Sequence, residues 1–172
     1  MDLRIEPCTA ADLSRLLAGP VDPRSAAHHR ERSALQDSGE ATYLLAWRGA
    51  ENVGRATLYH RSKYAAVRAR HPGTAEINAL EATPQGQGIG SALIAAAEAI
   101  AARRGHDAVG LAVEPGNSRA RRLYERLGYF PWGHGEVIDI WTEPRPGGDV
   151  EHRDPCDYLR KALPREDSAP AR

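Results

Sequence analysis

The sequence predicts one α/β domain, and three observations lead to that class. Strand-like segments alternate with amphipathic helical segments along the chain. A length of 172 residues is enough for one hydrophobic core and short for two. The sequence also contains no internal repeat. We therefore expect a single domain over residues 1–163 and a polar, disordered tail over residues 164–172.

The N-terminal half predicts helices and strands in alternation. Thr9 begins a helix because its side chain can cap the backbone and an acidic residue stands three positions on. Gly19 and Pro20 end that helix. The segments expected here are a strand at 2–6, the helix from Thr9, a polar helix at 24–38, a hairpin of strands at 42–47 and 53–60, and a loop or short helix at 61–74.

The C-terminal half predicts a strand, a glycine turn, a helix, a strand and a helix in that order. Apolar residues recur every three or four positions in both helices, so each helix has one apolar face. Asn117 or Ser118 can cap the second helix, and Gly128 can close it. The expected segments are a strand at 75–82, a turn at 83–90, a helix at 91–105, a strand at 107–113, a helix at 118–127, and strands at 136–141 and 156–163.

Charge and hydropathy argue against several classes of partner. The 23 basic and 23 acidic residues balance, so we expect neither nucleic acid nor a membrane surface as partner. The N-terminus lacks a secretory pattern and no segment approaches the roughly 20 apolar residues of a membrane span, which predicts a cytoplasmic protein. Cys8 and Cys156 are far apart and lack metal-ligand spacing, so no metal or disulfide is expected.

Three alternate glycines between a predicted strand and a predicted helix form the most informative segment. Gly86, Gly88 and Gly90 would expose backbone N–H groups at the positive end of the helix dipole, where an anion binds well. The alternative is a tight turn that needs positive φ angles and binds nothing. The spacing fits neither a dinucleotide fingerprint nor a Walker loop, because Ser91 is not preceded by Lys.

These residues resemble the GNAT family of N-acetyltransferases. Residues 85–90, Gln-Gly-Gln-Gly-Ile-Gly, are similar to the family's Gln/Arg-x-x-Gly-x-Gly/Ala signature, and a second family block is matched by Asn117, Ala120, Tyr124, Gly128 and Tyr129. The resemblance covers residues 75–130 closely. It implies a mixed, mostly antiparallel sheet of six to seven strands flanked by helices, with a splayed pair of parallel strands, 76–82 and 108–113, that holds acetyl-CoA.

The resemblance also implies a set of cofactor-binding residues. The backbone amide of Leu80 would face the thioester carbonyl, and Tyr124 would protonate the leaving thiolate, although its ring could instead serve only the core. Asn117 would bind the pantetheine arm or cap its own helix. The expected cofactor-binding set is Leu80, Ala82, Gln85, Gly86, Gln87, Gly88, Ile89, Gly90, Ser91, Asn117 and Tyr124.

The acceptor amine must lose a proton to a general base. The candidates near the glycine turn are Glu81, Glu76 and Asn78. Because side chains alternate along a strand, Glu76, Asn78 and Leu80 share one face. Glu81 lies on the other face unless a bulge changes its direction. We favour Glu81 because an acidic residue often stands at the similar position of the family, while an exposed, inert carboxylate is the alternative.

Other polar and aromatic residues are less specific signals. His28 and His29 are adjacent, so they cannot converge on one ligand from a helix and are expected to be solvated. The aromatic residues either line an acceptor pocket or pack in the core: Trp47, Tyr59, Tyr64, Trp132 and Trp141. The helical arginines either face solvent or meet the 3′-phosphate of the cofactor: Arg103, Arg104, Arg119, Arg121, Arg122 and Arg126.

Taken together, the residues and the resemblance predict an acetyl-CoA-dependent N-acetyltransferase that acts on a primary amine of a small molecule by direct attack. Two alternatives stay open: an acetyltransferase of protein N-termini of the ribosomal-protein type, and a non-catalytic acyl-CoA sensor. The expected partners are a small-molecule amine or a peptide N-terminus. An exposed C-terminal strand would also permit a homodimer.

Overall fold

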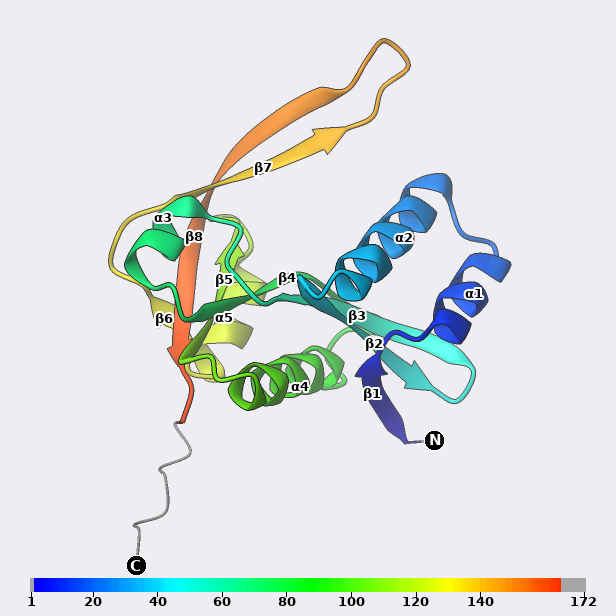
Figure 1. The fold of residues 1–172 in the computed structure, drawn as a ribbon, viewed down its shortest axis with the longest axis horizontal. Coiled ribbons are helices and arrows are strands. Elements are labelled where there is room, and N and C mark those ends of the chain that lie inside the picture. Colours follow the sequence, from blue (N-terminus) through cyan, green and yellow to red (C-terminus); the bar gives the residue numbers. More distant parts are fainter. Residues whose placement is uncertain (1, 165–172) are drawn as a thin grey trace, which may run out of the picture.

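An eight-stranded sheet with helices on both faces forms the body of the protein (Figure 1). The computed structural model describes residues 2–164, so the expected tail lies, from residue 165, outside the described residues. The strands are β1 (Leu3–Pro7), β2 (Ala41–Arg48), β3 (Glu51–Tyr59), β4 (Thr74–Ala82), β5 (Ala108–Val113), β6 (Phe130–Pro131), β7 (Val137–Glu143) and β8 (Val150–Ala162). The helices are α1 (Ala10–Ala18), α2 (Pro23–Asp37), α3 (Ala65–Arg70), α4 (Ile89–Arg103) and α5 (Ser118–Arg126).

The sheet is mixed and mostly antiparallel, as expected. Its order is β1-β2-β3-β4-β5-β8-β6, with β7 pairing β8 outside this path. Of these pairs only β4 and β5 run parallel. Two strands with a helix between them, β4-α4-β5, therefore build the centre of the molecule, and the glycine turn lies where α4 begins.

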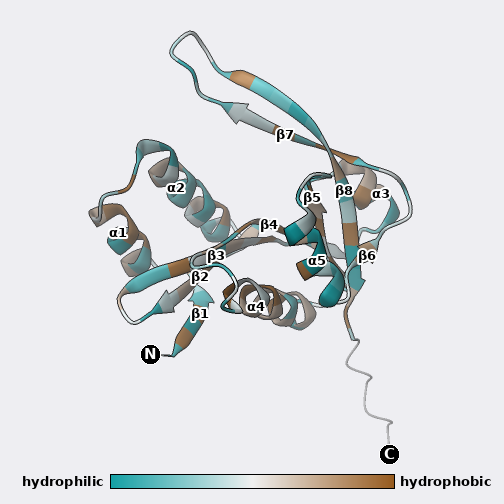
Figure 2. Cartoon of the chain, turned by 180° about the vertical axis from the view of Figure 1, so that it is seen from behind, coloured by the Kyte–Doolittle hydropathy of each residue, from teal (hydrophilic) through white to brown (hydrophobic). Residues whose placement is uncertain are grey.

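The two faces of the sheet carry different helices. On one face α4 packs its apolar residues, including Leu93 and Ala97, against Leu44 and Ile77 in the main core. On the other face α1 covers Tyr43 and Trp47, and α2 lies beside it. The hydropathy colouring shows that α2 is largely hydrophilic (Figure 2), which fits the absence of a large apolar side chain among its buried residues.

The helix signals in the sequence are confirmed. The Thr9 side chain accepts from the backbone N–H of Asp12, and the Asp12 carboxylate accepts from the N–H of Thr9, which completes a capping box at the start of α1. Asp22 caps α2 by accepting from the N–H groups of Arg24 and Ser25, with Pro23 in the first turn. The Asn117 side chain caps α5 by accepting from the N–H of Ala120 at 3.1 Å.

Two expectations about the C-terminal strands are wrong. Strand β8 begins at Val150, not at residue 156, because its first half pairs only with β7 in an arm that projects from the body (Figure 1). Outside the core these residues need no apolar alternation, so the pattern did not reveal them. The sheet has eight strands instead of six or seven, since β6 is a two-residue strand, too short for any periodic signal.

The second half of the C-terminal strand is not an exposed edge. Residues Asp157–Ala162 pair with β5 on one side, while β6 and β7 pair with β8 on the other. On the arm, β7 and the first half of β8 each have one side without a strand partner among the described residues. Within residues 2–164, no helix is long and apolar enough to cross a membrane.

Candidate active site

Strands β4 and β5 separate in the middle of the sheet. They pair only from Thr74 to Glu76, opposite Ala108 to Gly110. Beyond this point β4 carries a bulge at Ala79, a non-glycine residue with φ +51°. Among the described strands, neither neighbour offers a pairing partner to Ala79 or Leu80. This segment therefore leaves the regular strand pairing where β4 and β5 diverge.

The bulge also changes which side chains share a face. Asn78 and Glu81 of β4 are three positions apart. The residues that they face on β3, Thr57 and Arg55, are only two positions apart. This extra residue turns Glu81 toward the face that carries Asn78. Glu76, opposite Tyr59, lies on the same face, because Arg55, Thr57 and Tyr59 alternate regularly along β3.

A large cleft of about 450 Å³ opens between the glycine turn and α5. In the described residues none of the backbone N–H groups of residues 85–91 donates a hydrogen bond to another residue. Gly86 and Gly88 have φ angles of +80° and +76°, and nothing lies within 4 Å of where their Cβ atoms would be. The turn is therefore an open cradle of free donors at the start of α4.

The charge of the large cleft favours an anion. Arg119, Arg122 and Arg126 of α5 line it, and no acidic side chain among the described residues does. Arg119 also donates to the side-chain oxygen of Gln85, which joins α5 to the glycine turn. A ligand with several negative charges fits this combination of free amides and guanidinium groups.

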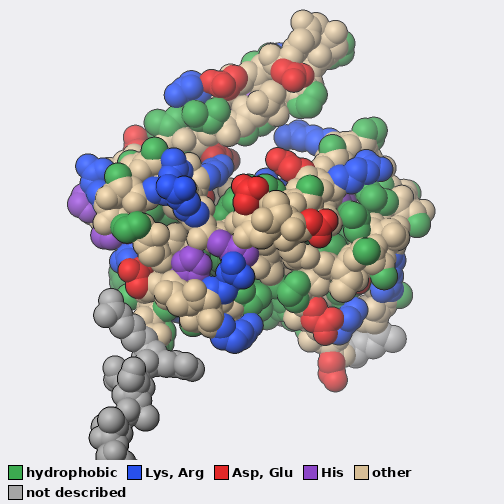
Figure 3. Space-filling view, viewed as in Figure 1, with side chains coloured by type: hydrophobic (Ala, Val, Ile, Leu, Met, Phe, Trp, Pro, Cys, Tyr) green, Lys and Arg blue, Asp and Glu red, His purple; other side chains and the backbone are tan. Residues whose placement is uncertain are grey.

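A small cleft of about 210 Å³ adjoins the large one at the point where β4 and β5 diverge. The two clefts share Leu80, Asn117, Ala120 and Tyr124. The charged side chains that line the small cleft are Glu114 and Asp139, and no described cationic side chain lines it. The surface near it is recessed between the β7–β8 arm and α2, with acidic and basic side chains at its border (Figure 3). The lining of the large cleft is thus cationic and that of the small cleft acidic, with Asp139 paired to Lys63, which lies outside the lining.

Tyr124 lies at the junction of the two clefts. The residue is 9% exposed, and its ring stands edge-on to that of Tyr129 in the core. Burial raises the pKa of the Tyr124 phenol, so it stays protonated at neutral pH. The ring belongs to the core while the residue still lines both clefts, so the two roles considered for it coexist.

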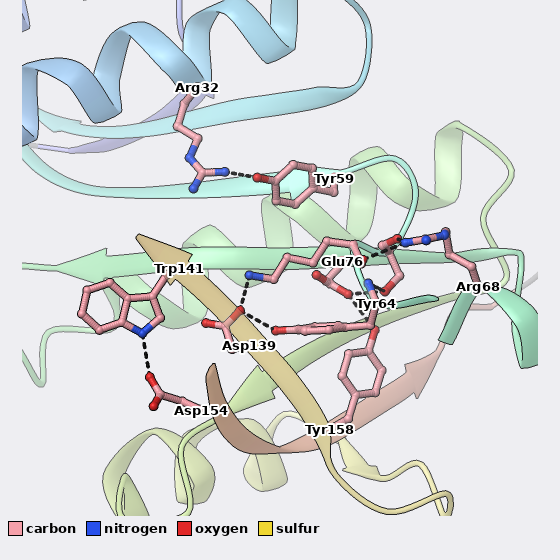
Figure 4. A network of polar contacts seen from close by, with 11 residues as sticks. Arg32, Tyr59, Tyr64, Arg68, Glu76, Asp139, Trp141, Asp154 and Tyr158 are labelled. Carbon is pink, nitrogen blue, oxygen red and sulfur yellow. Dashed lines mark hydrogen bonds and ion pairs between the residues drawn. The ribbon is translucent and has the colours of Figure 1, made fainter. Parts of the chain in front are cut away.

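Glu76 is a buried carboxyl group on β4 (Figure 4). It is 1% exposed, and its Oε2 accepts hydrogen bonds from the Ser62 and Tyr158 hydroxyl groups, the latter at 3.2 Å. Its Oε1 has no partner among the described residues. Burial raises the pKa of Glu76 to about 7. Glu76 can therefore exchange a proton near neutral pH.

Glu81, the base favoured on sequence grounds, lies in a different environment. Its side chain is 60% exposed and forms a 2.6 Å ion pair with Arg55. Within the described chain it lines neither cleft. Asn78, the third candidate, does line the small cleft.

Most of the expected cofactor residues gather at the large cleft. Gln87 does not line it, and its side chain instead accepts from Arg48. Ile89 contributes to the lining although its side chain is 1% exposed and packs in the core. The others that line it are Leu80, Ala82, Gln85, Gly86, Gly88, Gly90, Ser91, Asn117 and Tyr124.

The acidic residues of the small cleft were missed in the sequence. Asp139 accepts hydrogen bonds from Lys63 and from the Tyr64 hydroxyl, the latter at 3.1 Å (Figure 4). The sequence did carry one sign of Asp139, because it lies between Ile138 and Ile140 in a predicted strand, and aspartate is unusual in strands. Glu114, just after β5, gave no signal of its own.

The aromatic residues and histidines divide between core and surface. Tyr64 lines the small cleft, while Trp47 is buried under α1 and Trp141 is exposed on the arm. The expectation that the histidine pair is solvated is wrong. His29 is 4% exposed and bonds Tyr43, because the side of α2 that faces the sheet carries it.

The fold and the cradle define a class of protein that binds an anionic cofactor beside a splayed strand pair. The model of the acetyltransferase (GNAT) family matches residues 11–129, more than half of the chain. The chain therefore belongs to the GNAT acetyltransferase family, whose members use acetyl-CoA.

One sequence relative and three solved structures illustrate the similarity. The chain is 33% identical over 110 residues to a mycothiol acetyltransferase from Arthrobacter sp. (strain FB24). This alignment covers 63% of this chain and 32% of that protein. The matched part thus spans about a third of that relative. An N-acetyltransferase from Staphylococcus aureus Mu50 has a TM-score of 0.68 at 14% identity, covering 95% of this chain and 100% of the other.

Two further structures have a similar fold. The paia N-acetyltransferase from Thermoplasma acidophilum, in complex with coenzyme A, has a TM-score of 0.59 at 19% identity, covering 95% of this chain and 100% of the other. A ribosomal-protein-alanine N-acetyltransferase from Brucella melitensis has a TM-score of 0.62 at 21% identity, covering 93% and 99%. At these identities the structures show the fold alone.

The residues of the large cleft fit acetyl-CoA. The free amides of the glycine turn suit a pyrophosphate, and the open space above Gly86 and Gly88 lets a ligand approach the backbone. The three arginines of α5 suit further phosphate charge. The clefts join at Leu80 and Tyr124. The acetyl group of a cofactor in the large cleft would meet an acceptor in the small cleft at this junction.

Proposed function

We propose that this protein transfers an acetyl group from acetyl-CoA to a primary amine of a small molecule by direct attack. The observation that carries the proposal is the meeting of two clefts of opposite charge at Leu80 and Tyr124. A cationic cleft suits the phosphates of the cofactor, and an acidic cleft attracts an amine, which arrives as an ammonium ion. Bound acetyl-CoA supplies an activated acetyl thioester.

Leu80 and Tyr124 would act on the two sides of the transfer. The backbone N–H of Leu80, a residue without a strand partner among the described residues, would face the oxygen on which negative charge develops. Such a preorganised donor lowers a barrier by roughly 3 kcal/mol. The Tyr124 phenol, kept protonated by burial, would donate its proton to the departing thiolate.

Among the candidate bases we favour Glu76 over Glu81. A base works best when its pKa lies near the working pH, and that of Glu76 is about 7. Glu76 itself lines neither cleft of the described chain, but it shares a strand face with Asn78, which lines the small one, so a water molecule beside Asn78 would carry the proton from the amine to Glu76. Glu81 is neutralised by Arg55 and exposed, which leaves it less suited to the task.

Direct attack is favoured over an acyl-enzyme because the available nucleophile is poor. Cys156 lines the small cleft, but burial raises the pKa of its thiol to about 11. A thiol that is protonated at neutral pH is a weak nucleophile. The amine itself is then the group that attacks.

The size of the small cleft favours a small-molecule acceptor. About 210 Å³ accommodates a compact amine, whereas a protein N-terminus would need a longer groove. The ribosomal-protein-alanine N-acetyltransferase of similar fold keeps the protein acceptor as the second candidate. A non-catalytic acyl-CoA sensor is disfavoured by the phenol at the junction of the clefts and by the titratable carboxyl group on β4.

Thiol release from acetyl-CoA against a panel of small amines and N-terminal peptides tests the proposal. Release with small amines is expected, and release with peptides alone would favour the second candidate. Cofactor binding without release for any acceptor would favour the sensor. A homodimer is a separate proposal, for which the free strand edges of the arm are the available surface, and a monomer mass in solution would exclude it.

A further inference from the structure

Helix α2 and strand β3 enclose a group of buried polar atoms without partners. The described residues contain five buried side-chain polar atoms that form no hydrogen bond, and four of them lie on these two elements: His28 Nε2, Arg32 Nε, Arg55 Nε and Thr57 Oγ1. More than nine in ten buried polar groups in proteins have a partner. Four orphans in one place therefore indicate a group that the protein alone does not satisfy.

The hydrogen bonds around these atoms fix the protonation of the histidines. Arg55 Nη1 lies 3.2 Å from His29 Nε2, and because a guanidinium only donates, this nitrogen accepts. His29 Nδ1 then carries the proton and donates to the Tyr43 hydroxyl at 2.7 Å. Burial lowers the pKa of His28 to about 4, so His28 is neutral as well. The charge of the region is thus set by its arginines.

Arg32 is the unneutralised charge of this region. Arg55 is paired with Glu81, but Arg32 bonds only the Tyr59 hydroxyl and has no carboxylate partner among residues 2–164. A guanidinium has five N–H donors, and most of those of Arg32 are unused. The fork of donors matches the two oxygens of a carboxylate.

The region lies beside the small cleft. Thr57 is paired with Asn78, which lines that cleft, and neighbouring strands are about 4.8 Å apart. Arg32 and Tyr59 lie on one side of the view in Figure 4, and Asp139 lies on the other. An acceptor in the small cleft would have its amine near the acidic residues and its other end near Arg32.

We propose that the acceptor amine also carries a carboxylate, held by Arg32 with Arg55 behind it, so that the substrate class is a short amino acid. The inference rests on the proposed function and names the acceptor of that same site. Arg32 and the cleft are linked through the sheet, because Arg32 contacts Tyr59 and Tyr59 lies opposite Glu76, two positions from Asn78 of the small cleft. Of the unpartnered atoms, Nε of Arg32 and Nε of Arg55 can only donate, which suits an anion at this wall of the site.

The test compares acids with their amides as acceptors. Glycine, β-alanine, 4-aminobutanoate and 5-aminopentanoate, and the four matching amides, are assayed for thiol release with the wild type, Arg32→Gln and Arg30→Gln. Arg30 is an exposed residue of the same helix and serves as the matched control. Cofactor affinity and the melting midpoint of each variant show that the fold and the large cleft are intact.

We expect at least one acid to have a KM roughly tenfold to hundredfold below that of its amide, the size of a lost charged hydrogen bond. Arg32→Gln should remove this preference and Arg30→Gln should keep it. Equal use of acids and amides by the wild type, or a preference that survives Arg32→Gln, would overturn the inference while leaving the acetyltransferase intact.

If no amine releases thiol, the proposed function fails and calorimetry decides the inference separately. Binding of 4-aminobutanoate to the coenzyme A-bound wild type, lost in Arg32→Gln, would still support the carboxylate site. Absence of binding of all four acids to the wild type would contradict it.

Discussion

At the scale of single residues, the proposed chemistry depends on two buried side chains with a polar group, one at the junction of the clefts and one on β4. Tyr124 combines a ring packed in the core with a position on both clefts, and Glu76 combines full burial with a pKa near 7. Placing a titratable group in such surroundings costs stability, which proteins accept at functional sites. Both residues can be tested by removing one polar function.

Replacing Tyr124 with Phe removes the phenol and keeps the ring. We expect turnover to fall by roughly tenfold to a thousandfold, because the thiolate would leave without its proton donor, while coenzyme A affinity stays near that of the wild type. Steady-state kinetics and direct cofactor binding measure the two effects. Tyr129→Phe is the matched control, since that hydroxyl bonds Glu98 and lines neither cleft within the described residues. Turnover of Tyr124→Phe at the wild-type level would remove Tyr124 as the acid.

Glu76 should leave a signature in the pH dependence of stability. Its pKa is about 7 in the folded protein against 4.5 as an ordinary glutamate, so the folded state holds the proton more tightly between these values. Its stabilising contribution is therefore complete below pH 4.5 and is lost as pH rises to about 7, by about 3 kcal/mol. Denaturant unfolding from pH 4.5 to 8 measures this slope.

Glu76→Gln should flatten that slope, whereas Glu81→Gln should not, because Glu81 is exposed. If Glu76 is also the base, the rate of the wild type rises with pH through about 7, and Glu76→Gln loses that limb. Parallel stability profiles for the wild type and Glu76→Gln would contradict the burial argument.

At the scale of elements, the bulge of β4 and the glycine turn after it create the site. The bulge opens β4 from β5, and the turn presents its free amides at the start of α4. Both devices use unusual φ angles, at Ala79 in the bulge and at Gly86 and Gly88 in the turn. A substitution at one of these positions separates backbone strain from ligand contact.

Replacing Gly88 with Ala tests the cradle. Alanine at φ +76° costs roughly 1–2 kcal/mol of stability, and its Cβ would occupy the open space over the amides. We expect coenzyme A affinity to fall at least tenfold by calorimetry. Gly39→Ala carries the same strain, with φ +79° and open space around it, in the turn between α2 and β2. An equal loss of affinity in both variants would show that strain alone is responsible.

Elements with a local chemical signal could be predicted from the sequence, and the others could not. The capping box at Thr9 and the alternate glycines at 86–90 depend on contacts within a few residues, so the sequence predicted the helix start and the turn that they form. The bulge depends on the register between β3 and β4, and an alanine at position 79 gives no sign of it. For the same reason, the face on which Glu81 lies was left open, and Asp139 was missed because its role comes from an arm that folds beside Tyr64.

At the scale of the whole molecule, a neutral chain separates its charges. The 23 basic and 23 acidic residues cancel in sum, yet the arginines of α5 line one cleft and Glu114 and Asp139 line the other. The net charge of the sequence therefore said little about the electrostatic potential in each cleft. That potential depends on how the sheet brings α5, β5 and the β7–β8 arm together. The two fields meet at the gap between β4 and β5, where the account places the reaction.

The most direct test of this account is a single-turnover reaction with isotopically labelled acetyl-CoA, followed by mass spectrometry of both the protein and the amine. We predict that the label appears on the amine in equal amount to the free thiol, and that the protein without amine stays unlabelled, because the Cys156 thiol is protonated. Label on the protein before the amine is added would contradict direct attack. Failure of any label to leave the cofactor, with acceptors of every class present, would contradict the acetyltransferase itself.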